Sequence, residues 1–110
     1  MIYISVKFAI RPEKADAFME AAADYTAATR QEPGNVFFEW SRSLDEPDTF
    51  VLLEGFRDAE AGDAHVAGAH VQDFFSWAPD WVTTTPQIIY IDKPDLTGWG
   101  PMGEIAPRER

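Results

Sequence analysis

The sequence lacks cysteine altogether, and it has neither a cluster of basic residues nor a long apolar run. Without cysteine there is no disulfide, no thiolate nucleophile and no thiolate metal ligand. The formal net charge is −10, which argues against nucleic acid or an anionic membrane surface as a partner, because both are negatively charged. The first ten residues do not resemble a signal peptide, and no apolar run reaches the length of a membrane span. A cytoplasmic location is therefore expected.

Aromatic side chains, by contrast, are abundant. Phe, Trp and Tyr make up 14% of a chain of 110 residues, which is the size of one domain. Aromatic rings bury a large area for few rotatable bonds, so they are typical of apolar pockets and large interfaces. We therefore expect one compact core that contains a pocket or supports an interface.

Patterns typical of a strand, a helix and a second strand follow one another in the first half of the chain. Apolar and other residues alternate over residues 2–10, which predicts a central strand. Pro12 suits the first turn of a helix, and apolar residues then repeat at helical spacing to about Gln31. Pro33-Gly34 ends this helix, and residues 35–43 alternate as a second strand.

A hairpin is expected next. Residues 45–48 have the composition of a turn, so the strand before them and a third strand over residues 49–56 should pair antiparallel. With the turn centred there, Phe38 faces Glu54, although a slip of one residue would reverse the faces that meet.

The last third of the chain predicts an interrupted helix and a final strand. Asp58 can cap the helix, a bend is expected near Gly68, and Pro79 cannot continue the helix without losing a backbone hydrogen bond. Helical segments are expected up to Pro86, and residues 87–92 alternate as a strand.

The element order βαββαβ predicts an α+β fold of the ferredoxin-like type over residues 1–93. One four-stranded antiparallel sheet would carry both helices on one face, and its other face needs a cover. The sheet of a second copy is the simplest cover, which predicts a homodimer. Residues 94–110 form either an arm over a surface or a flexible tail, since they are rich in Gly and Pro but contain Trp99 and Met102.

Three titratable side chains near the hairpin suggest a functional site. Glu54 stands mid-strand among large apolar residues, where a carboxylate needs a partner or a raised pKa. His65 and His70, the only histidines, follow on the next helix and can exchange protons near neutral pH. On a continuous helix, positions five apart differ by about 140°, so the two imidazoles are not expected to converge on one metal ion. The bend near Gly68 weakens this argument.

Several segments of the chain together form a recognisable pattern: Pro33-Gly34-Asn35-Val36, Phe38-Glu39-Trp40, Phe50 to Phe56, Asp58, Ala64-His65, Ala69-His70 and Phe74. This pattern resembles the antibiotic biosynthesis monooxygenase (ABM) superfamily, most closely its small proteins of the quinol monooxygenase type. The resemblance implies a dimeric α+β barrel with a pocket between helices and sheet in each subunit. It also implies oxygenation of a small aromatic diol, quinol or polyketide by O2 without metal or flavin.

Such a reaction needs a base and a dry aromatic pocket. His65 or His70 is the candidate base, Glu54 can orient it, and Asn35 can bind a substrate oxygen. The candidate substrate-binding wall consists of Phe38, Trp40, Phe74, Trp77 and Trp81. Structural alternatives stand beside these roles: the histidines could cap local backbone or lie exposed, Asn35 could form a turn, and Glu54 could be neutralised by Arg42 or Arg57.

Other functions remain open on the same fold. The protein could bind a small aromatic molecule without turnover, or it could be an isomerase whose anionic substrate would need Arg42 or Lys7. The haem-degrading branch of the superfamily uses an Asn, a Trp and a His where this sequence has Lys7, His65 and Phe75, so haem is not expected as a cofactor.

Overall fold

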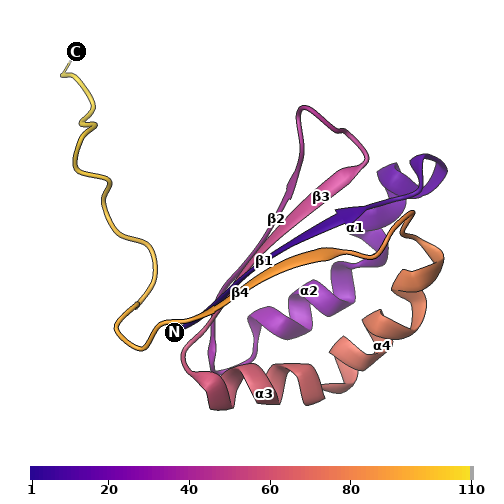
Figure 1. Cartoon of the computed structure of the whole chain (residues 1–110), viewed down its shortest axis with the longest axis horizontal. Coiled ribbons are helices and arrows are strands. Elements are labelled where there is room, and N and C mark those ends of the chain that lie inside the picture. Colours follow the sequence, from indigo (N-terminus) through magenta and orange to yellow (C-terminus); the bar gives the residue numbers. More distant parts are fainter. Residues whose placement is uncertain (110) are drawn as a thin grey trace.

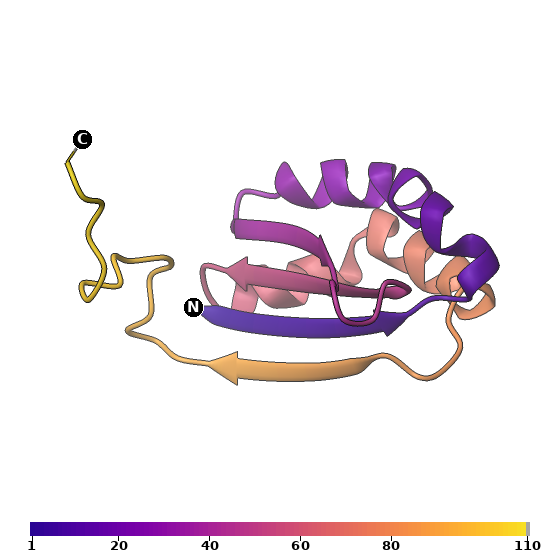
Figure 2. The ribbon, with the colours of Figure 1, turned by 90° about the horizontal axis from the view of Figure 1, so that it is seen from above.

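In the computed structural model, residues 1–109 are described, and they form one sheet with helices on one of its faces (Figures 1 and 2). The strands pair antiparallel in the order β2-β3-β1-β4. This is the ferredoxin-like α+β fold that the element order predicts. In chain order the elements are β1 (Ile2–Ala9), a 3₁₀ helix (Pro12–Ala17), α1 (Phe18–Ala21), α2 (Ala23–Arg30), β2 (Asn35–Arg42), β3 (Thr49–Phe56), α3 (Ala59–Ala67), α4 (Ala69–Trp77), a 3₁₀ helix (Ala78–Asp80) and β4 (Gln87–Asp92).

The hairpin of β2 and β3 has the expected register. Phe38 lies opposite Glu54, and a bulge between Asn35 and Phe37 shifts the pairing at the start of β2. Since side chains opposite each other share a face of the sheet, Glu54 and Phe38 both point toward the helices, where the core lies.

The second helical region breaks at the expected glycine. The Asp58 carboxylate accepts a hydrogen bond from the backbone N–H of Ala61 (2.8 Å) and so caps α3. Gly68 adopts an extended conformation (φ −66°, ψ 142°), which ends α3 and lets α4 begin in a new direction. The prediction of helical segments up to Pro86 is wrong, because the second 3₁₀ helix ends at Asp80. The chain then forms an isolated bridge between Val82 and Ile10, the residue just after β1.

An aromatic cluster forms the core between the helices and one half of the sheet. Its centre is Phe18, whose side chain is fully buried. The centroid of the Phe18 ring lies 5.0–6.5 Å from the rings of six neighbours, namely Phe8, Trp40, Phe50, Phe74, Trp77 and Trp81. Such edge and tilted contacts stabilise the core beyond the effect of the area that each ring buries.

Apolar surface remains uncovered on β4, the edge strand. Four consecutive side chains of this strand, Ile88, Ile89, Tyr90 and Ile91, are 43–62% exposed, and they point alternately to both faces of the sheet.

Beyond β4 the chain leaves the domain (Figure 1). Trp99 contacts Phe37 with ring centroids 5.6 Å apart. Among residues 1–109, no helix has the length and apolar character needed to cross a membrane.

Candidate functional site

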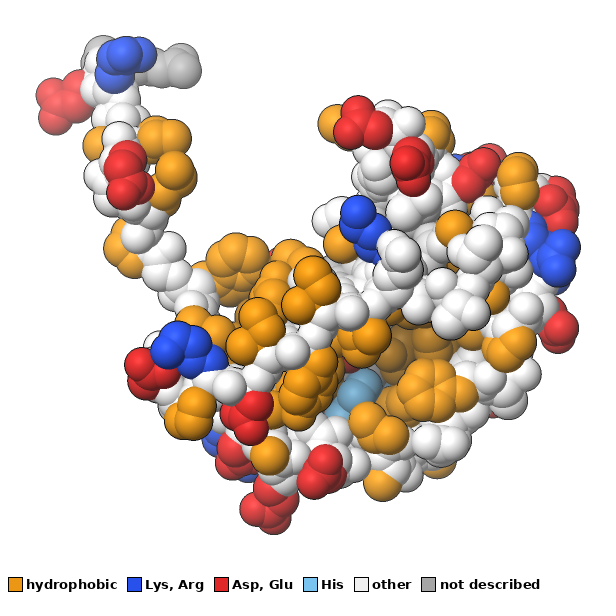
Figure 3. All heavy atoms as spheres, viewed as in Figure 1, with side chains coloured by type: hydrophobic (Ala, Val, Ile, Leu, Met, Phe, Trp, Pro, Cys, Tyr) orange, Lys and Arg blue, Asp and Glu red, His pale blue; other side chains and the backbone are white. Residues whose placement is uncertain are grey.

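A cavity of about 580 Å³ opens between the sheet and α3–α4. Its walls are mostly apolar, with Ile4, Val6 and Phe8 from β1 on one side and Phe74 from α4 on the other. A histidine side chain is visible inside the hollow in the space-filling view (Figure 3). Small organic molecules bind in cavities of this size and character, where a few polar groups fix their orientation.

The polar end of the cavity is built around His65. Its side chain is only 5% exposed, and it lies between two carboxylates. Nδ1 lies 2.8 Å from Oε2 of Glu32, and Nε2 lies 3.4 Å from Oε1 of Glu54. Glu54 comes from β3 and lines the cavity together with His65, so this pair presents proton-accepting groups to any molecule inside.

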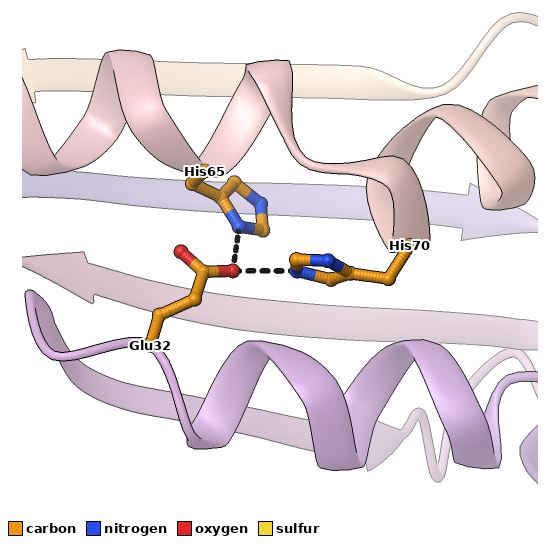
Figure 4. A group of neighbouring side chains, drawn as sticks. All are labelled: Glu32, His65 and His70. Carbon is orange, nitrogen blue, oxygen red and sulfur yellow. Dashed lines mark hydrogen bonds and ion pairs between the residues drawn. The ribbon is translucent and has the colours of Figure 1, made fainter.

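The same oxygen of Glu32 also contacts His70, whose Nε2 lies 2.6 Å away (Figure 4). The two imidazoles therefore converge on one point, and the expectation from continuous helical geometry is wrong. The break at Gly68 is the reason, because it reorients α4 against α3. A β-carbon at Gly68 would lie 2.6 Å from the His70 ring, so glycine is required for this ring position.

Glu32 is the site residue that the sequence interpretation missed. Its backbone lies in the turn after α2, where its N–H donates to the carbonyl of Thr29 (3.0 Å). Tyr25 and Thr29 are buried on one face of α2, and Glu32, three residues after Thr29, continues their spacing just beyond the end of the helix. This spacing was the available signal, but a glutamate next to Pro-Gly suggests a solvated turn.

The surroundings of His65 favour its protonated form. Burial of the ring lowers the pKa of His65, but hydrogen bonds to Glu54 and Glu32 raise it by more, so the pKa lies above its ordinary value of 6.5. Burial, together with the charges of Glu54 and Glu32, raises the pKa of the Tyr25 hydroxyl well above its ordinary value. Tyr25 therefore stays a hydrogen-bond donor on the cavity wall.

Comparison with known proteins assigns this chain to a family. The sequence matches the antibiotic biosynthesis monooxygenase (ABM) family over residues 1–77. The chain belongs to this family. A relative in Bacillus subtilis (strain 168), named "Putative monooxygenase YcnE", is 32% identical over 74 residues, which cover 67% of this chain and 78% of that protein.

Solved structures of similar fold include a "Putative antibiotic biosynthesis monooxygenase" from Nitrosomonas europaea (TM-score 0.78, 27% identity). It aligns with 84% of this chain and 98% of its own. The fold is also shared by Rv0793 from Mycobacterium tuberculosis (TM-score 0.79, 21% identity), over 88% of this chain and 98% of that one.

Within this ABM domain, Asn35 lies outside the cavity. Its side-chain amide donates to the carbonyls of Phe37 (2.9 Å) and Gly55 (3.2 Å) and so holds the bulge at the start of β2.

Arg42 and Arg57 do not neutralise Glu54. Arg42 pairs with exposed aspartates near the hairpin, and Arg57 pairs with the capping Asp58.

Of the five aromatic residues expected on the wall of the ABM pocket, only Phe74 lines the cavity. Phe38 is buried behind His65, with ring centroids 6.1 Å apart. Trp40 donates its indole N–H to the hydroxyl of Thr26 (2.9 Å), and Trp77 and Trp81 pack on each other in the aromatic cluster. Alternation along β2 places Phe38 and Trp40 on the face that carries the helices, but their position along the sheet keeps both rings out of the cavity.

Proposed function

We propose that the protein is a cofactor-independent monooxygenase that oxidises a small aromatic diol, quinol or polyketide with O2. One observation carries this proposal: the imidazole of His65, held between two carboxylates, forms the polar end of an otherwise apolar cavity. The names of the family and of the Bacillus subtilis relative support the same class of reaction.

The reaction starts with removal of a phenolic proton, because the phenolate is electron-rich enough to reduce O2 directly. One electron passes to O2, and the resulting radical pair combines to a peroxide on the ring. Loss of water then leaves one oxygen atom of O2 in the product, so that a hydroquinone and O2 give a hydroxyquinone and water. A cavity with apolar walls favours this sequence because it keeps water away from the charged intermediates.

His65 is the proposed base, and neighbouring side chains stabilise its protonated form and pass the proton on. Glu54 stabilises the imidazolium that forms when His65 accepts a proton at Nε2. Glu32 contacts both His65 and His70, and the side chain of His70 is 24% exposed. The proton can therefore pass from the buried ring to solvent through Glu32 and His70.

An uncharged substrate suits this cavity better than the anion expected for an isomerase. Among residues 1–109, those that line it include neither Lys nor Arg. Lys7 lies exposed on β1, on the face of the sheet away from the helices, and Arg42 is held by Asp16 and Asp48.

The test is incorporation of ¹⁸O from ¹⁸O2 into a soluble hydroquinone by tag-free protein in the presence of a chelator. We expect one labelled oxygen per product and a kcat/KM that rises with pH. His65 must lose its proton to act as base, and its pKa is raised, so the acid limb should lie above pH 6.5. Glu32→Gln should move this limb to lower pH. Binding of the hydroquinone with O2 uptake no faster than its spontaneous oxidation would instead identify a binding protein.

We also propose a homodimer in which two sheets pack face to face, supported by the exposed apolar side chains of β4. Ile89 points away from the cavity, so Ile89→Lys should shift the dimer toward monomer, while Leu44→Lys in the exposed hairpin turn should not. Light scattering measures the outcome. A wild-type mass near the 12.4 kDa of one chain at micromolar concentration would refute the dimer.

A further inference from the structure

Glu32, His65 and His70 come from three different segments, the turn after α2, then α3, then α4, and they point toward one another (Figure 4). One ligand-forming atom from each, Oε2 of Glu32, Nδ1 of His65 and Nε2 of His70, lies within 4.8 Å of the other two. Two imidazole nitrogens and one carboxylate oxygen are a ligand set that Zn²⁺ binds, with a water molecule in the fourth position.

The distances from the Glu32 oxygen to the two imidazole nitrogens are close to those of a metal site. Zn²⁺ holds tetrahedral N and O ligands at about 2.0–2.2 Å, which spaces the ligand atoms about 3.3 Å apart. The oxygen of Glu32 now lies 2.8 and 2.6 Å from the two nitrogens, so an ion needs these distances to open by less than about 1 Å. Rotation of the Glu32 side chain can supply this movement, while its backbone is held by hydrogen bonds to Thr29 and Asn35.

We propose that Glu32, His65 and His70 bind a Zn²⁺ ion in place of the protons they share, and that this ion inhibits the oxygenase. Glu54 completes the arrangement, because it lies 3.4 Å from the other nitrogen of His65. A histidine that binds a metal commonly donates its second ring N–H to a carboxylate, which fixes the ring and strengthens the ligand. The net charge of −10 further favours a cation.

Inhibition follows from the chemistry of one imidazole ring. A neutral ring that coordinates the ion through Nδ1 carries its hydrogen on Nε2, so it has no lone pair left to accept a phenolic proton. Glu32 and His70 are not among the residues that line the cavity, so the ion would lie behind His65 and not beside the substrate. This half of the proposal rests on the proposed function, whereas the binding of Zn²⁺ does not.

Binding is tested on tag-free protein freed of metal with a chelator and then titrated with Zn²⁺ by calorimetry. We expect one ion per chain, and Glu32→Gln and His70→Gln should each weaken binding at least tenfold. Glu54→Gln, which alters the outer partner of His65, should weaken it about tenfold. Asp73→Asn and Glu60→Gln remove an exposed carboxylate from α4 and α3 and should bind as wild type does. Equal affinity in wild type, Glu32→Gln and His70→Gln would overturn the site.

Inhibition is tested with the same ion, because Zn²⁺ is redox-inert and cannot oxidise a quinol itself. Saturating Zn²⁺ should lower hydroquinone oxidation at least tenfold, and chelator should restore it. The residual activity of His70→Gln should not respond to the same concentration. Binding at the cluster without loss of rate would overturn the inhibition. Binding in a protein that shows no oxidation at all would support the site and refute the proposed function.

Discussion

Replacement of His65 by glutamine is expected to lower kcat/KM for hydroquinone oxidation about a hundredfold or more, the usual effect of removing a positioned general base. Glutamine cannot accept the phenolic proton, but its amide can still donate a hydrogen bond to Glu54 or Glu32. Alanine is a poorer choice at this position, because it would leave the carboxylate of Glu54 buried without its partner. O2 uptake with chelator present measures the effect, after subtraction of spontaneous oxidation.

His70→Gln is the matched control for this experiment. It changes the other histidine of the cluster, which touches Glu32 but does not line the cavity. A smaller loss is expected from it, because the first proton transfer to His65 is untouched and only the onward route to solvent is impaired. Wild-type rates in His65→Gln would rule out this residue as the base.

The fold could be predicted from the sequence because local patterns and turn chemistry agree with one another. The hairpin register follows from the turn at residues 45–48, and it fixed the pairing of Phe38 with Glu54. The break at Gly68 also follows from local chemistry, since glycine weakens a helix interior. The end of the second helical region could not be predicted in this way, because the bridge between Val82 and Ile10 is a contact between distant segments.

The site was only half predictable for the same reason. Glu54 lies on β3 and His65 on α3, the helix that follows this strand, so their proximity follows from chain order. Glu32 lies 33 residues before His65 in the sequence, and the packing of α2 on α4 brings it to the site. That packing depends on the core, in particular on the Tyr25 ring, which stacks on Phe74 with centroids 4.2 Å apart. The carboxylate of Glu32 therefore joins the site only once the two helices are docked.

The aromatic cluster that docks these helices should be tested separately from the chemistry. Phe18→Ala is expected to lower the free energy of unfolding by about 3–5 kcal/mol, because it deletes a fully buried ring and leaves a cavity between α1 and the sheet. This is a large share of the roughly 5–15 kcal/mol that holds a domain together. Urea unfolding followed by tryptophan fluorescence measures the change. Phe75→Ala, at the half-exposed rim of the cavity, is the control and should cost far less.

Activity then distinguishes the two kinds of residue. Phe18 does not line the cavity, so the folded fraction of Phe18→Ala should keep more of its kcat/KM than His65→Gln does, although it loses more stability. The wall residue Phe8 and the stacked Phe74 both contact the Phe18 ring, so a modest rise in KM is expected as they relax into the space left behind. Unchanged stability in Phe18→Ala would show that the cluster is not the core. A loss of activity as deep as that of His65→Gln, measured where the variant is folded, would place Phe18 in the catalytic machinery instead.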